Sequence, residues 1–239
     1  MSVTGIVAAL TAEARTLGPA LQTIPGGGAR SCDLQMLPGG DLLATSGMGP
    51  EAAARAALAL VAAGARNLLS FGLVGALDPQ LAAGTVLLAE AVIDGCGTAY
   101  PTSHPWRERL ALRAASRGIA GGSLLSVGQP LSTPAAKAQA RERTGACAVD
   151  MESFAIGGIA VQQGLNFAVA RVVIDTALDT VPRSIQQATG PRGQVSCARL
   201  TWGLIRAPAD IPALLQLSRR YRLAMGSLRY LGQRVVGSP

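Results

Sequence analysis

Residues 166–177 read NFAVARVVIDTA, an apolar run that is interrupted by Arg171 and ends at Asp175. Such runs, rich in Val and Ile, are typical of strands buried on both faces of a parallel sheet. Other strand-like segments cover residues 5–10, 41–47, 67–77, 84–93 and 123–128. A helix-like stretch covers residues 51–63, and residues 148–164 start at a strand end and become a helix. The alternation predicts α/β architecture: a single three-layer domain with a central mixed, mostly parallel sheet flanked by helices.

The composition narrows the class of protein further. The 239 residues are 49% hydrophobic and 15% charged, which excludes an intrinsically disordered chain. No repeat or linker divides the sequence, so residues 1–239 are expected to form one domain. No uncharged apolar run reaches the roughly 18 residues of a membrane span, and no basic segment precedes the first apolar stretch as in a signal peptide. Scattered cysteines without disulfide-scaffold density favour a reducing cytoplasm; they are Cys32, Cys96, Cys147 and Cys197.

Positive charge is concentrated at the C-terminal end. The net charge is +7, and residues 199–239 hold seven arginines against one acid, Asp210. Apolar residues recur every three or four positions from Leu214 to Val235, which predicts an amphipathic helix at about 211–235 with arginines on its other side. Aromatic residues (3%) are too few for a nucleic-acid-binding surface. Two interpretations stay open: the helix packs on the core with its basic face solvated, or that face contacts anionic lipid.

Two charged side chains lie within the most apolar strand. Loss of hydration at Asp175 would raise the pKa of its carboxyl group, as a general acid requires. The alternative is that Asp175 caps the turn that follows the strand. Arg171 needs an anionic partner, because an unpaired buried charge is costly. Alternation places Arg171, Val173 and Asp175 on one face, at the sheet end where α/β proteins bind ligands. A structural ion pair from Arg171 to Asp150 or Glu152 is the competing explanation.

Three further acids are candidates for sugar binding or catalysis. Asp150 and Glu152 flank Met151 at the start of a predicted helix. A carboxylate there can accept hydrogen bonds from two neighbouring ribose hydroxyls, or it can simply favour the helix dipole. Glu13 follows the first strand, where a solvated helix face is the alternative.

Several enzyme classes lack their motifs in this chain. The turn Gly47-Met48-Gly49 does not have the spacing of a dinucleotide site, and a P-loop is absent. There is no zinc-ligand spacing and no serine nucleophile elbow. The single histidine, His104, lies in a segment without clear periodicity, which is unsuited to a catalytic triad. We therefore expect no metal and no cofactor.

Four pieces of the sequence, taken in order, resemble the nucleoside phosphorylase/nucleosidase superfamily across residues 3–177. They are GIVAALTAE (5–13), SGMGP (46–50), SFGLVGALDPQLAAGTVLLAE (70–90), and AVDMESFA (148–155) with VARVVID (169–175). The element VDMES followed by R-x-x-x-D is specific to this group. Within it the chain is most similar to 5′-methylthioadenosine/S-adenosylhomocysteine nucleosidases. The tail LTWGLIRAPADIPALLQL (200–217) resembles the hopanoid-associated phosphorylase branch.

The resemblance implies a phosphorylase/hydrolase-like fold and hydrolysis of the N-glycosidic bond of a 5′-substituted adenosine, with release of adenine. In the hopanoid-associated branch the substrate would be adenosylhopane, a membrane lipid that carries the nucleoside. The resemblance also implies three catalytic positions. Asp175 would protonate adenine N7, Glu13 would orient and deprotonate the attacking water, and Arg171 would lie beside Glu13.

Five substrate-binding positions are implied in the same way. Glu152 would hold the ribose hydroxyls and Met151 would pack on the sugar. Met48 would line the pocket of the 5′-substituent. Gly75 would lie near the base, and Leu131 would stack on adenine.

Departures from the family pattern bear on the reaction. Ile174 replaces the usual Ser or Thr before the acid, and residues 72–75 read Gly-Leu-Val-Gly instead of Gly-Ser-Ala-Gly. Ser70 and Leu73 stand where phosphorolytic members hold phosphate with an arginine and a serine. Because an oxyanion then has little to bind, hydrolysis is predicted over phosphorolysis.

Two alternatives to hydrolysis are kept: a phosphate-dependent purine nucleoside phosphorylase, and a non-catalytic nucleoside-binding protein at a membrane. The low charge content and the family habit predict a homodimer or larger homo-oligomer in the cytoplasm. Peripheral contact with the inner face of the membrane, through the C-terminal helix, is left open. No nucleic-acid partner is expected.

Overall fold

Two ten-residue strands, β5 (Asn67–Ala76) and β12 (Asn166–Asp175), lie side by side and parallel at the centre of the molecule. The computed structural model describes residues 2–24, 34–116, 118–181 and 211–236, with only the backbone for residues 211–215. Both strands are buried over most of their length, because their apolar side chains face helices on either side. The segment expected to be the central strand therefore is one.

Shorter strands extend the sheet on both sides of this pair. They are β1 (Thr4–Ala8), β2 (Gln22–Ile24), β3 (Leu34–Met36), β4 (Leu42–Thr45), β6 (Val86–Leu87), β7 (Ala91–Ile93), β8 (Ala99–Pro101), β9 (Ile119–Ala120), β10 (Ser123–Ser126) and β11 (Ala148–Asp150). The order is β2-β3-β4-β1-β5-β11-β10-β7-β8, with β12 joined to β5 and β6, and β6 joined to β9. The pairs β4-β1-β5-β12 are parallel, whereas the β2-β3 and β7-β8 pairs at the edges are antiparallel. The expected mixed sheet is thus confirmed.

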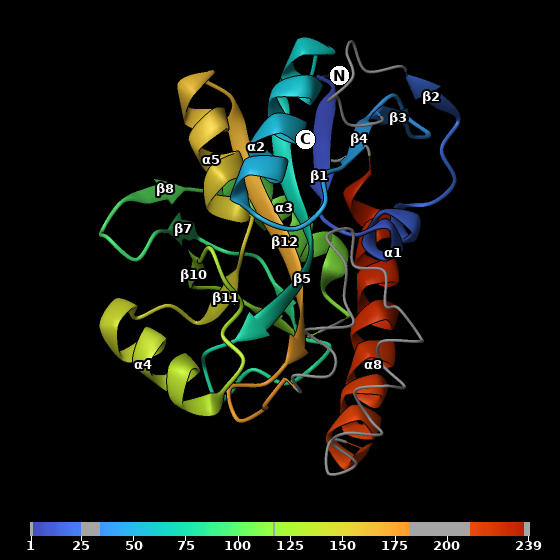
Figure 1. The fold of residues 1–239 in the computed structure, drawn as a ribbon. Coiled ribbons are helices and arrows are strands. Elements are labelled where there is room, and N and C mark those ends of the chain that lie inside the picture. Colours follow the sequence, from blue (N-terminus) through green and yellow to red (C-terminus); the bar gives the residue numbers. More distant parts are fainter. Residues whose placement is uncertain (1, 25–33, 117, 182–210, 237–239) are drawn as a thin grey trace.

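Helices cover both faces of the sheet (Figure 1). They are α1 (Thr11–Ala14), the 3-10 turn η1 (Arg15–Leu17), α2 (Pro50–Ala62), α3 (His104–Ala114), α4 (Pro134–Thr144), α5 (Ser153–Gln162) and α8 (Ile211–Val235). α2 and α5 pack on one face, where Leu60 and Ile156 join the core. α3 and α8 pack on the other, through Trp106 and Leu228. The architecture is the predicted α/β domain with helices flanking a central sheet.

The C-terminal half of α8 is the part that packs on the core. Ala224, Leu228, Leu231 and Val235 are buried. Gly232 permits a close approach to η1, because an added Cβ would lie 2.6 Å from the carbonyl oxygen of Thr16.

The half of α8 before Ala224 is more exposed than the sequence pattern indicates. Tyr221, expected on the packed side, is 38% exposed, and Leu223 is 62% exposed. Arg219, Arg222 and Arg229 are exposed as expected. Arg199 and Arg206 lie outside the described residues, as does the side chain of Leu214. Within the described part of the chain, no helix has the length and apolarity to cross a bilayer.

Some elements differ from their prediction. Residues 84–93, expected to form one strand, form β6 and β7, which pair in parallel with β9 and β10. Val86 pairs with Ile119, and Val92 pairs with Leu124, so the register between the two segments changes by one residue. This change breaks the expected strand between β6 and β7. The segment at His104 is a helix whose buried residues are Trp106 and those four and eight positions later, too few to stand out as a pattern.

Candidate functional site

A cavity of about 240 Å³ opens at the carboxyl ends of the sheet strands. Residues that follow or end β1, β4, β5, β10, β11 and β12 line it, as expected for a ligand site of an α/β sheet. All eight sequence-predicted site residues contribute to its wall: Glu13, Met48, Gly75, Leu131, Met151, Glu152, Arg171 and Asp175. The structure therefore brings these residues together in one cavity.

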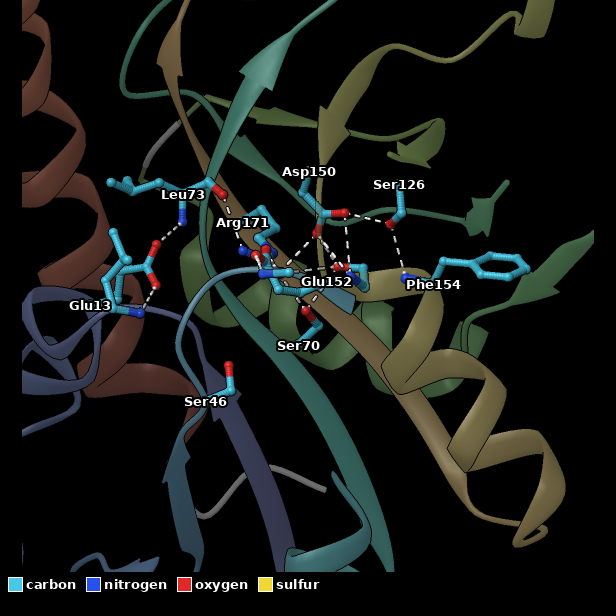
Figure 2. A network of polar contacts seen from close by, with 12 residues as sticks. Glu13, Ser46, Ser70, Leu73, Ser126, Asp150, Glu152, Phe154 and Arg171 are labelled. Atoms are coloured by element: carbon cyan, nitrogen blue, oxygen red, sulfur yellow. Dashed lines mark hydrogen bonds and ion pairs between the residues drawn. The ribbon is translucent and has the colours of Figure 1, made fainter. Parts of the chain in front are cut away.

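Arg171 of β12 lies at the centre of a buried polar network (Figure 2). Its Nη2 is 2.9 Å from Oδ2 of Asp150 and 3.6 Å from Oε2 of Glu152. The same nitrogen donates a hydrogen bond to Oγ of Ser70 (2.8 Å), and Nη1 donates to the carbonyl oxygen of Leu73 (3.1 Å). Burial opposes the charged guanidinium, but the neighbouring carboxyl groups outweigh it and raise the pKa of Arg171.

Asp150 ties this network to the start of α5. Its Oδ1 accepts a hydrogen bond from Oγ of Ser126 (2.5 Å), and its Oδ2 accepts one from the backbone N–H of Ser153 (3.2 Å). The Ser126 hydroxyl in turn accepts from the backbone N–H of Phe154 (2.9 Å). The structural ion pair that competed with a catalytic role for Arg171 is therefore present. Asp150 serves both as its partner and as an anion at the helix N-terminus.

Glu13 reaches the cavity from α1. Its Oε2 accepts a hydrogen bond from the backbone N–H of Leu10 (2.9 Å), and its Oε1 accepts one from the backbone N–H of Leu73 (2.8 Å). Burial raises the pKa of Glu13, while Arg171 and these N–H donors oppose the rise. Gly72 makes room for the carboxylate, because an added Cβ would lie 2.6 Å from Oε1.

The expected contact between Arg171 and Glu13 takes a different form. The peptide groups of Leu73 connect them: its N–H donates to Glu13, and its carbonyl oxygen accepts from Arg171 (Figure 2). The structure has no direct ion pair between the two side chains, because the guanidinium is occupied by carboxylates at the β11–α5 junction. Arg171 acts on Glu13 through its field and through this peptide.

Glu152 faces the cavity from the N-terminus of α5. Its Oε1 accepts a hydrogen bond from the backbone N–H of Gly49 (2.9 Å), so it joins the loop after β4 to the Arg171 network. Burial, which Arg171 opposes, and the nearby Asp150 raise its pKa to about 7. Met151 beside it is half-buried, and Met48 is 37% exposed at the rim.

Asp175 lies at the end of β12, where one extra residue breaks the register with β5. Val173 pairs with Val74 and Asp175 with Gly75, which leaves Ile174 in a bulge. Simple alternation does not anticipate this bulge, and as a result Ile174 and Asp175 both line the cavity. Burial raises the pKa of Asp175 against the opposing charge of Lys137. The capping role that competed for Asp175 belongs to Asp179, whose Oδ2 accepts from the N–H of Thr176 (2.7 Å).

Lys137 of α4 was missed by the sequence analysis. It is fully buried and forms an ion pair and hydrogen bond with Oδ2 of Asp175. A signal for it exists in the composition: Lys137 is the one lysine among 21 basic residues. A chain that uses arginine everywhere else needs a reason to keep a compact ammonium at one position.

The remaining wall of the cavity is apolar. Leu73, Val127, Ile174 and Val181 contribute to it. Arg171 is the one basic residue among the described residues of the lining, and it is already paired. In the described ranges no group of three or more His, Cys, Asp or Glu side chains is arranged to hold a metal ion.

Comparisons with known proteins agree with this architecture. A family model described as the phosphorylase superfamily matches residues 5–206. A search of curated protein sequences found no significant match. Among solved structures, 5′-methylthioadenosine/S-adenosylhomocysteine nucleosidase from Neisseria meningitidis, in complex with methylthio-immucillin-A, has a TM-score of 0.75 and 17% identity. That alignment covers 100% of both chains.

Two other similar structures are nucleosidases or hydrolases by name. Futalosine hydrolase of Helicobacter pylori has a TM-score of 0.70 and 16% identity, over 96% of this chain and 97% of that chain. S-adenosylhomocysteine nucleosidase from Streptococcus pyogenes, in complex with 5-methylthiotubericidin, has a TM-score of 0.70 and 18% identity, over 98% of each chain. At these identities the likeness shows a shared fold.

Proposed function

Since the chain belongs to the phosphorylase superfamily, we propose that it hydrolyses the N-glycosidic bond of a 5′-substituted adenosine and releases adenine. The observation that carries the proposal is that Glu13, Glu152 and Asp175 line one cavity at the carboxyl ends of the strands. These three acids, in a small and mostly apolar cavity whose fourth acid, Asp150, is paired with Arg171, are what the reaction needs. One acid binds the sugar, one activates water and one protonates the leaving base.

Asp175 is the proposed general acid. Breaking the glycosidic bond leaves negative charge on the base, and a proton from Asp175 would relieve it at N7. Burial keeps the proton on this carboxyl to a higher pH than in water. General-acid catalysis of this kind typically contributes about 10²- to 10⁴-fold.

Glu13 is the proposed base. Burial raises the pKa of Glu13, and two backbone N–H donors and the field of Arg171 oppose this rise and support the ionised form that a base needs. The carboxylate would take a proton from the attacking water and stabilise positive charge on the sugar.

Glu152 is the proposed ribose ligand. Its two oxygens can accept from neighbouring hydroxyls, and its link to Gly49 holds it beside Met48 at the rim. We propose that Met151 packs on the sugar, that Met48 contacts the 5′-substituent, and that Gly75 and Leu131 border the base.

Water rather than phosphate is the proposed nucleophile. A bound phosphate needs donors or cations that are free to receive it. Arg171, the one basic residue of the described lining, is already bonded to Asp150, Ser70 and the Leu73 carbonyl. A phosphate dianion beside Glu13 and Glu152 would meet net repulsion.

The finer proposal concerns the 5′-substituent. The lining of the cavity is mostly apolar, which favours an apolar group, and adenosylhopane is the proposed substrate. The exposed arginines of α8, together with exposed Leu223, suit an anionic membrane surface that presents such a lipid. We also propose a homodimer or larger homo-oligomer in the cytoplasm, which sedimentation measurements test.

A product assay tests the reaction. Adenosines with methylthio, homocysteinyl and long apolar 5′-substituents are incubated with the protein, with and without phosphate, and the products are separated by chromatography. We expect adenine and the free sugar at equal rates in both buffers. Phosphate-dependent release of a sugar phosphate would identify a phosphorylase. Tight nucleoside binding without base release would identify a non-catalytic binding protein.

Vesicle flotation tests the membrane contact. The full chain is compared with a variant in which Arg219, Arg222 and Arg229 are changed to Gln, on vesicles with and without anionic lipid. We expect the variant to lose most of its binding to anionic vesicles. Equal partitioning of both proteins would contradict a lipid-binding role for this face.

A further inference from the structure

The side of helix α4 that faces the protein interior carries an unusual residue. Of its eleven residues, Pro134–Thr144, the one that is fully buried is Lys137. Thr133 caps the helix by accepting a hydrogen bond from the N–H of Ala136 (3.2 Å), which fixes the first turn and aims Lys137 inward. The helix brings a single ammonium group beneath the site instead of an apolar face.

The ammonium group makes specific contacts at the end of β12. Nζ of Lys137 bonds Oδ2 of Asp175 and donates to the carbonyl oxygen of Thr176 (2.7 Å), with the carbonyl oxygen of Asp179 at 3.4 Å. Each acceptor carries full or partial negative charge, so the group is solvated by the protein in place of water. Among the described residues no other side chain donates a hydrogen bond to Asp175, which lines the cavity.

Protonation of the leaving base leaves a buried negative charge on Asp175, which Lys137 can stabilise. When an acid gives up its proton it becomes a carboxylate, and a carboxylate in a buried, mostly apolar site is costly unless a cation lies next to it. The ammonium group of Lys137 at Oδ2 places that cation there before the reaction begins, while Asp175 still holds its proton, so no reorganisation is needed as charge develops.

We infer that Lys137 is a positioning residue for the proposed reaction: it orients Asp175 and carries the counter-charge of the carboxylate that remains after proton transfer. The inference rests on the proposed function. In the step, the C–N bond breaks with its electron pair going to the base, and the proton of Asp175 goes to N7. Water adds to the sugar carbon and gives a proton to Glu13. Return of that proton to Asp175 through solvent restores the starting state.

The surroundings of Asp175 set the expected pH dependence. The charged groups near it are Lys137 from α4, Arg220 from α8 and Asp179 from the following turn, and Arg220 forms an ion pair with Asp179. Without the charge of Lys137, burial would act on Asp175 with less opposition, and its pKa would rise further. The acid would then hold its proton to higher pH and release it less readily.

The test compares adenine release by Lys137→Met, Lys137→Gln and Lys137→Arg as a function of pH. We expect kcat of the first two to fall about 10- to 100-fold, a part of what general-acid catalysis supplies, with KM nearly unchanged. Their basic limb should move up by about 1 to 3 pH units. Lys137→Arg should keep the basic limb near its wild-type position. Arg141→Met, on the same helix but paired with Asp78, is the matched control and should change neither quantity.

A second measurement does not depend on activity. With ¹³C in the aspartate carboxyl groups, the signal lost in Asp175→Asn identifies Asp175, whose titration is followed in the wild type and in the variants that fold. An upward shift in Lys137→Gln or Lys137→Met supports the inference, and an unshifted titration overturns it. An active wild type whose Lys137 variants lose rate without any shift of the basic limb also overturns it. A wild type that releases no base under any condition overturns the proposed function, and the inference with it.

Discussion

At the scale of single residues, the site depends on how buried charges find partners. Arg171 illustrates this, because its guanidinium holds Asp150 and Glu152 and bonds the Leu73 carbonyl in a place almost free of water. Ion pairs at such depth contribute little when intact, but removing one member leaves the others unpaired. The network is therefore sensitive to any single substitution.

Arg171→Met should lower the free energy of unfolding by about 3–5 kcal/mol, because it strands two carboxyl groups in the core. Urea titration measures the change. Arg141→Met, which removes a partly exposed ion pair with Asp78, is the control and should cost about 1 kcal/mol or less. If the two substitutions cost the same, the network does not have the electrostatic role assigned to it.

Gly72→Ala should lower the rate of base release strongly, because the new Cβ would displace the carboxylate of Glu13 from which it is 2.6–2.8 Å away. Gly64→Ala is the matched control: Gly64 also has a positive φ, but an added Cβ there meets nothing within 4 Å. The control should lose stability and keep its kcat. Similar kcat values for both variants would argue against catalysis by Glu13 in its present position.

The residue scale also shows what a single sequence can predict. The need of Arg171 for an acid followed from its burial in an apolar strand, and the acids named were the ones it binds. The link between Arg171 and Glu13 through the backbone of Leu73 was not predictable, because every residue except proline has the same backbone N–H and carbonyl groups. Lys137 lies 38 residues from its partner on a helix without an apolar stripe, so no periodicity reveals it.

At the scale of elements, long strands were predictable and short ones were not. The run ending at Asp175 could only be a buried strand, whereas β6 and β7 depend on a one-residue shift against β9 and β10 that no local pattern encodes. The spacing of apolar residues in 211–235 predicted a helix, but it did not predict at which residue α8 begins to pack on the core. That point depends on the partner surface and lies near Ala224.

Two leucines of α8 separate its packed part from its exposed part. Leu228→Ala should lower the free energy of unfolding by about 2–5 kcal/mol, since the side chain is fully buried between α8 and the sheet. Leu223→Ala, in the exposed half, should change it by about 0.5 kcal/mol or less. Denaturant titration of both variants measures the difference. Equal costs would mean that the exposed half of α8 is covered by something else, such as a second copy of the chain.

At the scale of the whole molecule, the sheet gathers several acids at one end and buries them there. Burial raises the pKa values of Glu13, Glu152 and Asp175 in the folded state. Between its ordinary pKa near 4.5 and its folded value of about 7, Glu152 keeps its proton when folded and has lost it when unfolded. Raising the pH through this window therefore favours unfolding.

The free energy of unfolding should accordingly fall as the pH rises from about 4.5 to about 7. Glu13 and Asp175 act in the same direction. Asp78 and Asp94, whose pKa values are lowered by backbone hydrogen bonds, lose their contribution only at lower pH. Glu152→Gln should flatten the decline, and urea titrations across this range would reveal it. A stability that rises over the same interval would contradict the burial of protonated acids.

The measurement that bears most directly on the account is adenine release by Asp175→Asn, set beside its affinity for the same nucleoside. The substitution keeps the shape of the side chain and removes the proton that the leaving base is proposed to take. We predict that base release falls about 10²-fold or more, the typical share of general-acid catalysis, while the nucleoside still binds. Base release at the wild-type rate in this variant would contradict the central claim.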